Sequence, residues 1–345
     1  MRGFKIGDIE VGTDRLPLVI PEIGINHGGS LRVACEMIDA AVQAGARLVK
    51  HQTHVVEDEM SDAARKVIPG NSKESIYDVM EHCALSEAEE HEMMRYAESL
   101  GMEFISTPFS RAAADRLERF DVKAYKIGSG EMNNYPLLEH VADFGKPMIV
   151  STGMNNLDSV EKAANILERK NVPYALLHCT NLYPTRPEQV RLGAMQQMME
   201  RFPGVPIGLS DHTRNNNACI AAIALGAAVV ERHFTDSMSR EGNDIVCSMD
   251  AGALRELLAA AEEVFAMRGG EKAPLAEEQV TIDFAFATVV AIEDIREGEL
   301  FTEKNLWVKR PGTGEIRAEK YPKLLGRHAV CDIKAGTHIT WSMVR

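Results

Sequence analysis

The sequence of 345 residues lacks several features that would mark whole classes of protein. Basic residues are in deficit, because 38 Lys and Arg stand against 51 Asp and Glu, which gives a formal net charge of −13. A general binder of nucleic acid or of an acidic membrane needs a basic footprint, so we expect no nucleic-acid partner. The uncharged apolar run Cys219–Val230 is shorter than the ~20 residues that span a bilayer, and no apolar export segment follows the start. We therefore expect neither a membrane partner nor a signal peptide.

Paired cysteines and nucleotide-binding glycines are also missing. The six cysteines are scattered, and none belongs to a Cys-x-x-Cys pair. Such thiols are typical of a reducing compartment, so we expect a cytoplasmic protein. The sequence has no Gly-rich dinucleotide fingerprint and no low-complexity tract. Without that fingerprint, an open doubly wound sheet is disfavoured.

What the sequence does contain is a regular alternation of short apolar runs with amphipathic stretches of helical period. Strands are expected at Leu18–Ile25, Leu48–Thr53, Glu103–Pro108, Ala124–Gly128, Met148–Ser151, Tyr174–Thr180, Ile207–Ser210 and Ala228–His233. Helices are expected between them, for example between Ser30 and Gly45, after the capping box of Ser86 with Glu89, and over Ala253–Met267. Eight strand–helix units in about 265 residues predict an α/β protein built on a (β/α)8 TIM barrel.

The pattern changes after Gly270. Residues 271–282 are charged and contain Pro274, which indicates a linker between domains. Within residues 283–345, the segment Asp294–Thr302 resembles Asp332–Thr340 at an offset of 38 residues. Two short copies of one unit predict a small, β-rich domain with pseudo-twofold character. We therefore expect a catalytic barrel over residues 1–270, a linker over 271–282 and a small domain over 283–345.

Nearly every predicted strand is apolar at its start and polar at its carboxyl end. In a barrel these ends converge on one mouth, where such enzymes hold their chemistry. A single serine there could simply be hydrated, but eight polar ends together predict a pocket. The cations, hydroxyls and amides among them, which we call the cradle residues, are Lys50, Gln52, Thr107, Lys126, Ser129, Ser151, Asn181 and Ser210. Two ammonium groups with such donors can hold a dianion, although either lysine could instead form a Schiff base.

His212 and His233 stand at the ends of the seventh and eighth predicted strands, which are neighbours in a barrel. Neutral imidazole is a common metal ligand, and Glu22 on the first strand closes the ring beside the eighth. Two imidazoles with nearby oxygen ligands favour Mn²⁺ or Mg²⁺ as a Lewis acid over Zn²⁺, which usually keeps three protein ligands. The alternative is a pair of hydrogen-bonded structural histidines.

A third group of candidates lies in loops beyond the strand ends and in the small domain: Glu131, Tyr183, Asp244 and Arg310. Loop acids are most often solvated, and only their position gives these a possible role. Acceptors over the mouth suit a neutral polyhydroxylated substrate, and an acid held near a metal could move a proton.

Eight short motifs contain most of these candidates. They are Glu22-Ile-Gly-Ile-Asn-His-Gly-Gly, Lys50-His-Gln-Thr-His, Ser106-Thr-Pro-Phe-Ser, Lys126-Ile-Gly-Ser-Gly-Glu131, Ser151-Thr-Gly-Met, Asn181-Leu-Tyr-Pro-Thr, Gly208-Leu-Ser-Asp-His-Thr and Glu231-Arg-His-Phe-Thr. Together they resemble the sialic acid synthase family, and the repeated C-terminal segment is similar to the antifreeze-like (SAF) domain of that family. The insert from Val55 to Asn71 is similar to that of the bacterial N-acetylneuraminate synthases in particular.

The resemblance implies condensation of phosphoenolpyruvate with N-acetylmannosamine and water to N-acetylneuraminate and phosphate, aided by Mn²⁺ or Mg²⁺. It implies that His212 and His233 hold the metal and that the cradle residues hold phosphoenolpyruvate. The residues implied to meet the amino sugar are Glu131, Tyr183, Asp244, Phe284 through its backbone, and Arg310. A homodimer is also implied, with each small domain covering the barrel of its partner.

In such a reaction the enol carbon attacks the sugar aldehyde, and water adds at the carbon that bears phosphate. Glu22 is our candidate to orient or deprotonate that water, so the expected catalytic set is Glu22, His212, His233 and Asp244. The tetrahedral product expels phosphate by C–O cleavage, which requires no lysine adduct. Three alternatives stay open: a synthase that converts a diacetamido sugar to legionaminic or pseudaminic acid, a Schiff-base aldolase, and a binding protein without activity.

Overall fold

The structure is a computed structural model that describes residues 3–70 and 72–345. Asn71, the last residue of the insert used for the family resemblance, lies outside the described residues. The chain divides into two compact units, Met1–Gly269 and Gly270–Arg345. Among the described residues, no helix combines the length and apolar character that a membrane span requires.

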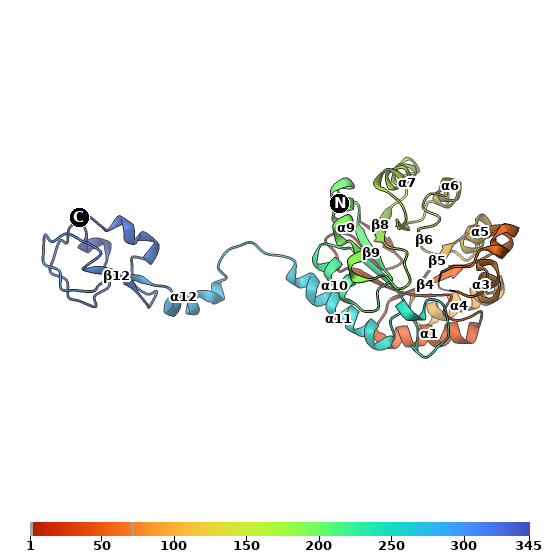
Figure 1. Cartoon of the computed structure of the whole chain (residues 1–345), viewed down its shortest axis with the longest axis horizontal. Helices are drawn as coiled ribbons and strands as arrows, with labels where there is room; N and C mark the ends of the chain where they lie inside the picture. The colour runs from red at the N-terminus through yellow and green to blue at the C-terminus, as the bar shows by residue number, and fades with distance from the viewer. Residues whose placement is uncertain (1–2, 71) are drawn as a thin grey trace. The chain divides into compact units, whose positions relative to one another are not determined.

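The first unit is a closed barrel of parallel strands in the order β10-β3-β4-β5-β6-β7-β8-β9 (Figure 1). The strands are β3 (Leu18–Gly24), β4 (Leu48–Thr53), β5 (Glu103–Pro108), β6 (Tyr125–Ile127), β7 (Met148–Ser151), β8 (Tyr174–Cys179), β9 (Ile207–Asp211) and β10 (Val229–His233). Strands β4, β5 and β7 have the predicted bounds, β6 is one residue shorter at each end, and the others differ by one residue at one end. The predicted barrel is confirmed.

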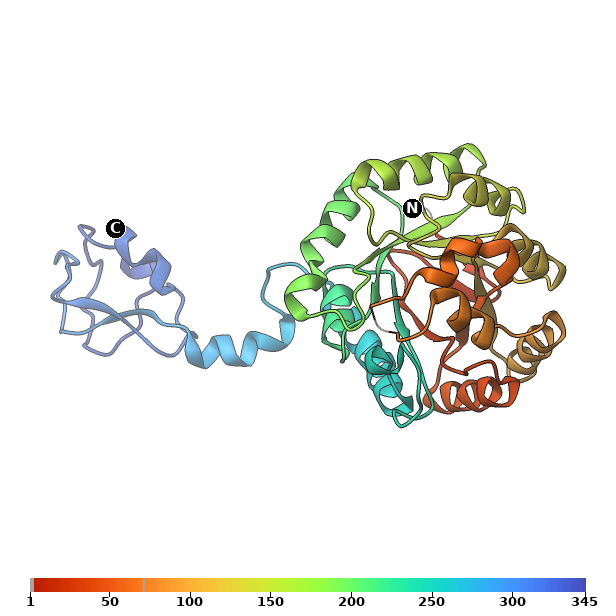
Figure 2. The same ribbon diagram turned by 45° about the vertical axis from the view of Figure 1, so that its right-hand side comes forward.

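Helices surround the barrel on its outer face (Figure 2). The longer ones are α1 (Leu31–Ala44), α3 (Ile76–Cys83), α4 (Glu87–Ser99), α5 (Arg111–Arg119), α6 (Tyr135–Ala142), α7 (Leu157–Arg169), α9 (Leu192–Arg201), α10 (Asn217–Ala224) and α11 (Ala251–Met267). Short helices lie in the loops: α2 (Val56–Glu59), η1 (Asp62–Lys66), α8 (Pro187–Val190) and η2 (Ile245–Cys247). Ser86 and Glu89 form the predicted capping box of α4. Helix α11 begins two residues earlier than expected, because Asp250 caps it by accepting a hydrogen bond from the Ala253 amide.

The interior of the barrel is apolar at the amino ends of the strands. Inward side chains such as Ile20, Leu48 and Ile105 form a buried cluster with residues of an N-terminal hairpin, β1 (Phe4–Ile6) and β2 (Ile9–Val11). The sequence analysis did not predict this hairpin, because an alternating pattern cannot be recognised in strands of three residues. The hairpin supplies apolar side chains to this end of the interior, and the polar side chains gather at the opposite end.

Outward side chains of the strands pack against the helices and form the main core. Val19 and Val49 belong to one buried cluster with Met37 and Ile38 of α1 and Leu138 of α6. Full burial of such a side chain contributes about 1.5–3 kcal/mol, so this layer supplies much of the stability of the barrel. The carboxyl ends of the strands are therefore fixed on a rigid frame.

The second unit is small and rich in extended backbone. Its elements are η3 (Ala276–Glu278), α12 (Gln279–Ala285), β11 (Thr288–Ala291), β12 (Leu306–Lys309), η4 (Ala318–Lys323) and η5 (Trp341–Met343). The two predicted copies pair reciprocally through an antiparallel bridge between Ile295 and Ile333. Asp294 accepts a hydrogen bond from the Ala335 amide at 2.9 Å, and Asp332 accepts one from the Glu297 amide at 2.8 Å. These contacts are equivalent under the repeat, which explains the internal similarity of the sequence.

The segment expected to be a linker contains helical turns. Helix η3 lies within residues 271–282, and α12 continues across their end into the expected small domain. Charge and Pro274 suggested an irregular segment, but the Glu278 carboxylate accepts a hydrogen bond from the Leu275 amide at 2.7 Å and so starts a helical turn.

Candidate active site

A pocket at the carboxyl ends of the strands collects side chains from the whole circumference of the barrel. It is lined by Glu22, Lys50, Gln52, Thr107, Phe109, Lys126, Gly128, Ser129, Gly130, Glu131, Ser151, Cys179, Asn181, Tyr183, Ser210, His212, Glu231 and His233. All predicted barrel candidates are in this set except Asp244, whose Oδ2 lies 3.7 Å from Nδ1 of His233. A larger cavity of about 620 Å³ beside Pro184 and Ala218 contains none of these candidates. Phe284 and Arg310 belong to the second unit, so their role stays a prediction.

The strand register places the central residues of the pocket opposite one another. Glu22 pairs in register with His233 on one side and with Lys50 on the other. Because side chains alternate along a strand, Lys50 and Gln52 point into the barrel while His51 points outward. His51 accordingly lies 3.2 Å from Glu90 of α4, outside the pocket.

Glu22 is held as a buried carboxylate by the residues around it. It accepts hydrogen bonds from the Lys50 ammonium and, at 2.7 Å, from the Gln52 amide. Burial alone would raise the pKa of Glu22, but Lys50, His233 and Gln52 outweigh it and hold the pKa well below its usual range. Glu22 is therefore a weak base that can accept hydrogen bonds at any physiological pH.

Lys126 forms the second cationic centre of the pocket. Its ammonium donates to Ser151 Oγ at 2.6 Å and to the Ile127 carbonyl at 3.1 Å, and it lies 3.6 Å from Glu231. Burial lowers the pKa of Lys126, and its contact with Glu231 opposes that shift. Glu231 also accepts a hydrogen bond from Ser210 at 3.2 Å and lies 4.0 Å from Lys50, so one carboxylate lies between both lysines.

The loops after β6, β7 and β8 meet beside these cations. The Gly153 amide donates to Ser129 Oγ at 3.0 Å, and Asn155 donates to the Ser129 carbonyl at 3.2 Å. Asn181 brings a buried amide oxygen that has no hydrogen-bond partner among the described residues. Hydroxyl, amide and ammonium groups thus converge on one side of the pocket, which suits an anion with several oxygens.

The two predicted metal-binding imidazoles are neighbours, as their strand positions require. The ring centroids of His212 and His233 are 5.4 Å apart, and the Tyr183 ring lies 4.1 Å from that of His212. Nδ1 of His212 is 3.0 Å from the Thr180 carbonyl, so Nδ1 donates and the neutral ring presents Nε2 as a lone pair. Burial would lower the pKa of His212, but Cys179, the Thr180 carbonyl and Glu22 raise it to about 9, so near neutral pH the ring is protonated and a cation bound at Nε2 would displace that proton.

These residues fit a hard divalent cation that keeps other ligands. Nδ1 of His233 is buried and has no hydrogen-bond partner in the part of the chain that the structure describes, and its Nε2 lies 3.9 Å from Glu22. A buried polar atom without a partner costs free energy, and a ligand would remove that cost. Within the described ranges, no group of three or more His, Cys, Asp or Glu has the arrangement of a metal site. Two imidazoles would therefore need oxygen ligands from water or substrate, as Mn²⁺ and Mg²⁺ accept.

Glu131 and Phe109 line the opposite side of the pocket. Burial raises the pKa of Glu131 to about 7, with Glu59 adding to the shift and Lys126 opposing it. A carboxyl group with this pKa exists in both protonation states near neutral pH and can donate as well as accept hydrogen bonds. Phe109 stacks on His54 with ring centroids 4.4 Å apart.

Five residues that line this pocket were not candidates from the sequence: Phe109, Gly128, Gly130, Cys179 and Glu231. Glu231 was recognised as a polar strand end but received no role, although its place two residues before His233 puts it on the same inward face. Phe109 follows the strand β5 and carried no signal, because an aromatic residue in a loop is ordinarily read as packing.

Comparison with known proteins shows the family to which this chain belongs. The model of the NeuB family matches residues 37–273, and that of the SAF domain matches residues 286–345. N,N'-diacetyllegionaminic acid synthase of Campylobacter jejuni is 37% identical over 92% of this chain and 97% of its own. Pseudaminic acid synthase of Campylobacter jejuni is 34% identical over 96% of this chain and 97% of its own length.

A solved structure agrees with these relatives. The N-acetylneuraminic acid synthetase of Leptospira borgpetersenii, crystallised with citrate, has a TM-score of 0.74 and 29% identity over 81% of this chain and 95% of its own. The relatives differ in the nonulosonic acid named for them, while the two Campylobacter jejuni synthases match nearly the whole length of this chain. The chain belongs to the NeuB family of sialic acid synthase-type enzymes, with a TIM barrel followed by a SAF domain.

Proposed function

We propose that this enzyme condenses phosphoenolpyruvate with N-acetylmannosamine and water to give N-acetylneuraminate and phosphate. The observation that carries the proposal is the presence, in one pocket, of two ammonium groups among hydroxyl and amide donors and of two adjacent imidazoles. The first set suits a phosphorylated carboxylate, and the second set suits a cation beside an aldehyde. The sugar is the finer part of the proposal, because relatives of similar identity are named for other nonulosonic acids.

The cradle residues bind phosphoenolpyruvate and fix its orientation. Lys50 and Lys126 neutralise its charge, while Ser151, Ser129 and Asn181 supply polar groups around its oxygens. Holding the enol carbon against the aldehyde in one pocket removes much of the entropic barrier to a bimolecular step.

His212 and His233 would hold Mn²⁺ or Mg²⁺, which when bound supplies Lewis-acid polarisation of the aldehyde oxygen. A carbon–carbon bond forms from the enol carbon to the aldehyde carbon, and positive charge develops at the carbon that bears phosphate. Water adds there, and one of its protons neutralises the alkoxide that carbon–carbon bond formation leaves on the former aldehyde oxygen. The hydroxyl of the tetrahedral product then gives its proton to phosphate, which departs with the bridging oxygen and leaves the new keto group. Glu22 orients this water, since its lowered pKa makes it a better acceptor of hydrogen bonds than of a proton.

Glu131, Tyr183 and Asp244 meet the amino sugar from the barrel. Their acceptors match the hydroxyl groups of a neutral sugar, and the protonated form of Glu131 can donate to a carbonyl oxygen. Phe284 and Arg310 would complete the sugar site from the second unit. In a cytoplasmic homodimer, the SAF domain of one protomer would cover the barrel of its partner and restrict access of water.

The decisive experiment supplies phosphoenolpyruvate with N-acetylmannosamine, its 6-phosphate and the diacetamido precursors of legionaminic and pseudaminic acids in parallel. We expect phosphate release with N-acetylmannosamine, its loss with a chelator and its rescue by Mn²⁺. Turnover of a diacetamido sugar alone would contradict the substrate assignment. Phosphate release with no sugar at all would contradict the condensation.

A Schiff-base aldolase is the alternative that the same lysines permit. Lys50 donates to Glu22 and lies 4.0 Å from Glu231, and Lys126 donates to Ser151 and to the Ile127 carbonyl, so both nitrogens are held by polar partners and neither is free to attack a carbonyl. We therefore expect borohydride with pyruvate to trap no adduct. A trapped pyruvyl adduct on Lys50 or Lys126 would contradict the proposed mechanism.

A further inference from the structure

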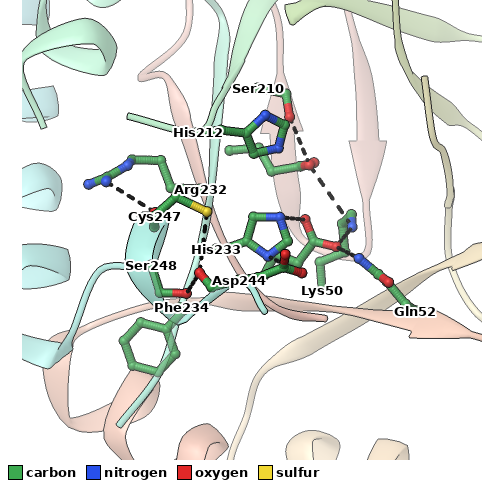
Figure 3. Close-up of polar contacts among 12 residues, drawn as sticks. Lys50, Gln52, Ser210, His212, Arg232, His233, Phe234, Asp244, Cys247 and Ser248 are labelled. Carbon is green, nitrogen blue, oxygen red and sulfur yellow. Dashed lines mark hydrogen bonds and ion pairs between the residues drawn. The ribbon is translucent and has the colours of Figure 1, made fainter. Parts of the chain in front are cut away.

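Arg232 lies on β10 between Glu231 and His233, but its side chain points out of the barrel. It is only 1% exposed and is surrounded by the loops after β9 and β10. Figure 3 shows it beside Cys247, on the far side of the strand from Lys50 and Gln52. Neither the sequence motifs nor the proposed mechanism gives this arginine a role.

The guanidinium contacts both neighbours of His212, the Asp211 side chain and the Thr213 backbone, and also the backbone of the turn after Asp244. Its Nη2 donates to the Thr213 carbonyl at 2.7 Å and to the Cys247 carbonyl at 3.4 Å. Its Nη1 donates to the Asn216 side chain at 2.7 Å, and its Nε lies 3.2 Å from Asp211. Asp211 and Thr213 are themselves joined by two hydrogen bonds around His212, at 3.1 and 2.7 Å.

The hydrogen bond from Arg232 to the Cys247 carbonyl reaches the loop that carries Asp244. Cys247 belongs to η2, whose first turn is closed by a hydrogen bond from the Cys247 amide to the Asp244 carbonyl at 3.2 Å. Ser248 also donates to the Asp244 carbonyl, at 2.8 Å, and receives a hydrogen bond from Asn26 at 2.9 Å. The orientation of Asp244 toward His233 therefore depends on a turn to which Arg232 donates a hydrogen bond from outside the barrel.

Packing alone does not explain a buried guanidinium at this position. Burial of a charge costs several kcal/mol, and an apolar side chain of similar volume is often equally stable or more so. Arginine differs from such a side chain in presenting several donors in a rigid planar fork. Here that fork joins acceptors on two segments, 211–217 and 244–248, and each segment contains a residue of the proposed site.

We propose that Arg232 is a positioning residue that fixes His212, His233 and Asp244 relative to one another. The inference rests on the proposed function for the meaning of those three residues, but its structural content is independent of any substrate. Removal of the guanidinium frees the loops at 211–217 and 244–248 while the barrel remains folded. Outer contacts of this kind change metal affinity or activity by about 10–100-fold.

The test compares Arg232→Lys and Arg232→Met with the full-length wild-type protein by hydrogen–deuterium exchange, Mn²⁺ binding and steady-state kinetics. Lysine keeps the charge but can reach few of the acceptors, and methionine keeps most of the volume. We expect faster exchange confined to the two loops, weaker Mn²⁺ binding, and a fall in kcat of about 10–100-fold with little change in KM for phosphoenolpyruvate. Arg116→Met is the matched control, because Arg116 donates to Glu90 and to the Leu85 carbonyl but touches neither loop.

Each outcome decides between positioning and simple stabilisation. Exchange that rises evenly over the barrel, as in the control, overturns the proposal, and so does wild-type Mn²⁺ binding in both variants. If Arg232→Met does not fold, Arg232→Lys carries the test alone. If wild-type protein condenses no sugar, the proposed function fails, while loop-specific exchange in Arg232→Lys still supports the positioning role.

Discussion

At the scale of single residues, the site depends on which residues of each strand point into the barrel and which point out. Lys50 and Gln52 face the pocket, and His51 between them faces α4. The same rule puts Glu231 and His233 inside and Arg232 outside. A shift of one residue would exchange these faces, so the inward polar layer exists only in this register.

His233 is the residue on which the metal assignment depends most. Its ring is 3% exposed, lies beside His212 and carries a buried nitrogen without a hydrogen-bond partner among the described residues. We expect His233→Ala to abolish turnover and weaken Mn²⁺ binding by at least tenfold, with an unchanged circular dichroism spectrum. His82→Ala, at an exposed position of α3, is the control. Normal turnover in His233→Ala would remove the metal assignment.

Glu131 predicts a measurable dependence of stability on pH. Its pKa in the folded protein is about 7, above the ordinary value of 4.5, so the folded state holds this proton more tightly than the unfolded state. Ionisation of Glu131 thus lowers stability as pH rises from about 4.5 to about 7, by up to about 3 kcal/mol. Glu131→Gln removes this loss, so its free energy of unfolding should exceed that of wild type more at pH 8 than at pH 5.

Urea denaturation at both pH values measures the difference. Glu200→Gln changes an exposed carboxyl group on α9 and serves as the control, for which we expect a similar small effect at both values. An effect of Glu131→Gln that does not change with pH would contradict the assigned ionisation.

The sequence predicted most of these residues, because an inward polar residue at a strand end leaves a readable pattern. Arg232 was missed because it points out of the barrel, whereas its neighbours Glu231 and His233 point inward. An arginine on the outward side of a strand end is ordinarily assumed to be solvated. Its partners are mostly backbone carbonyls of distant loops, and no spacing in the sequence reveals those.

At the scale of elements, strands and long helices were predictable and short pieces were not. The capping residues Ser30 and Ser86 and the apolar period fixed α1 and α4 almost to the residue. The N-terminal hairpin and the short helices α2 and η1 were not predicted, because segments of three to five residues contain too few repeats for a period to be recognised. These short elements owe their structure to the surface that they cover.

The loops that build the cradle meet at Gly153. A Cβ atom there would lie 1.8 Å from Oδ1 of Asn181 and 2.8 Å from Oγ of Ser129. Both contacts are side-chain atoms that can move, so Gly153→Ala should fold but displace two groups of the cradle. We expect KM for phosphoenolpyruvate to rise about tenfold, roughly the loss of one hydrogen bond to a charged ligand.

Gly193→Ala is the matched variant, because a Cβ atom at that position of α9 meets nothing within 4 Å. Titration with phosphoenolpyruvate at saturating sugar compares the two. An unchanged KM in Gly153→Ala would place the phosphate-binding groups elsewhere in the pocket.

At the scale of the whole molecule, the chain joins a barrel to a unit with its own core. Val289, Phe301, Leu306 and Ile333 belong to a buried cluster of the second unit alone. A unit that folds around its own core can cover a site without being part of the barrel. The proposed lid of a homodimer uses this independence, and its assignment to one protomer or the other can be tested by mixing variants.

The mixing experiment combines a variant defective in the barrel, His233→Ala, with one defective in the second unit, Arg310→Ala. Co-expression with two different tags allows the heterodimer to be isolated from both homodimers. If each SAF domain serves the barrel of its partner, one site of the heterodimer pairs an intact barrel with an intact lid, and the other site has neither. We then expect about half the wild-type activity per dimer at limiting sugar, far above either parent. A lid that serves its own barrel leaves every site with one defect, so a heterodimer no more active than the Arg310→Ala homodimer would contradict the exchange of domains.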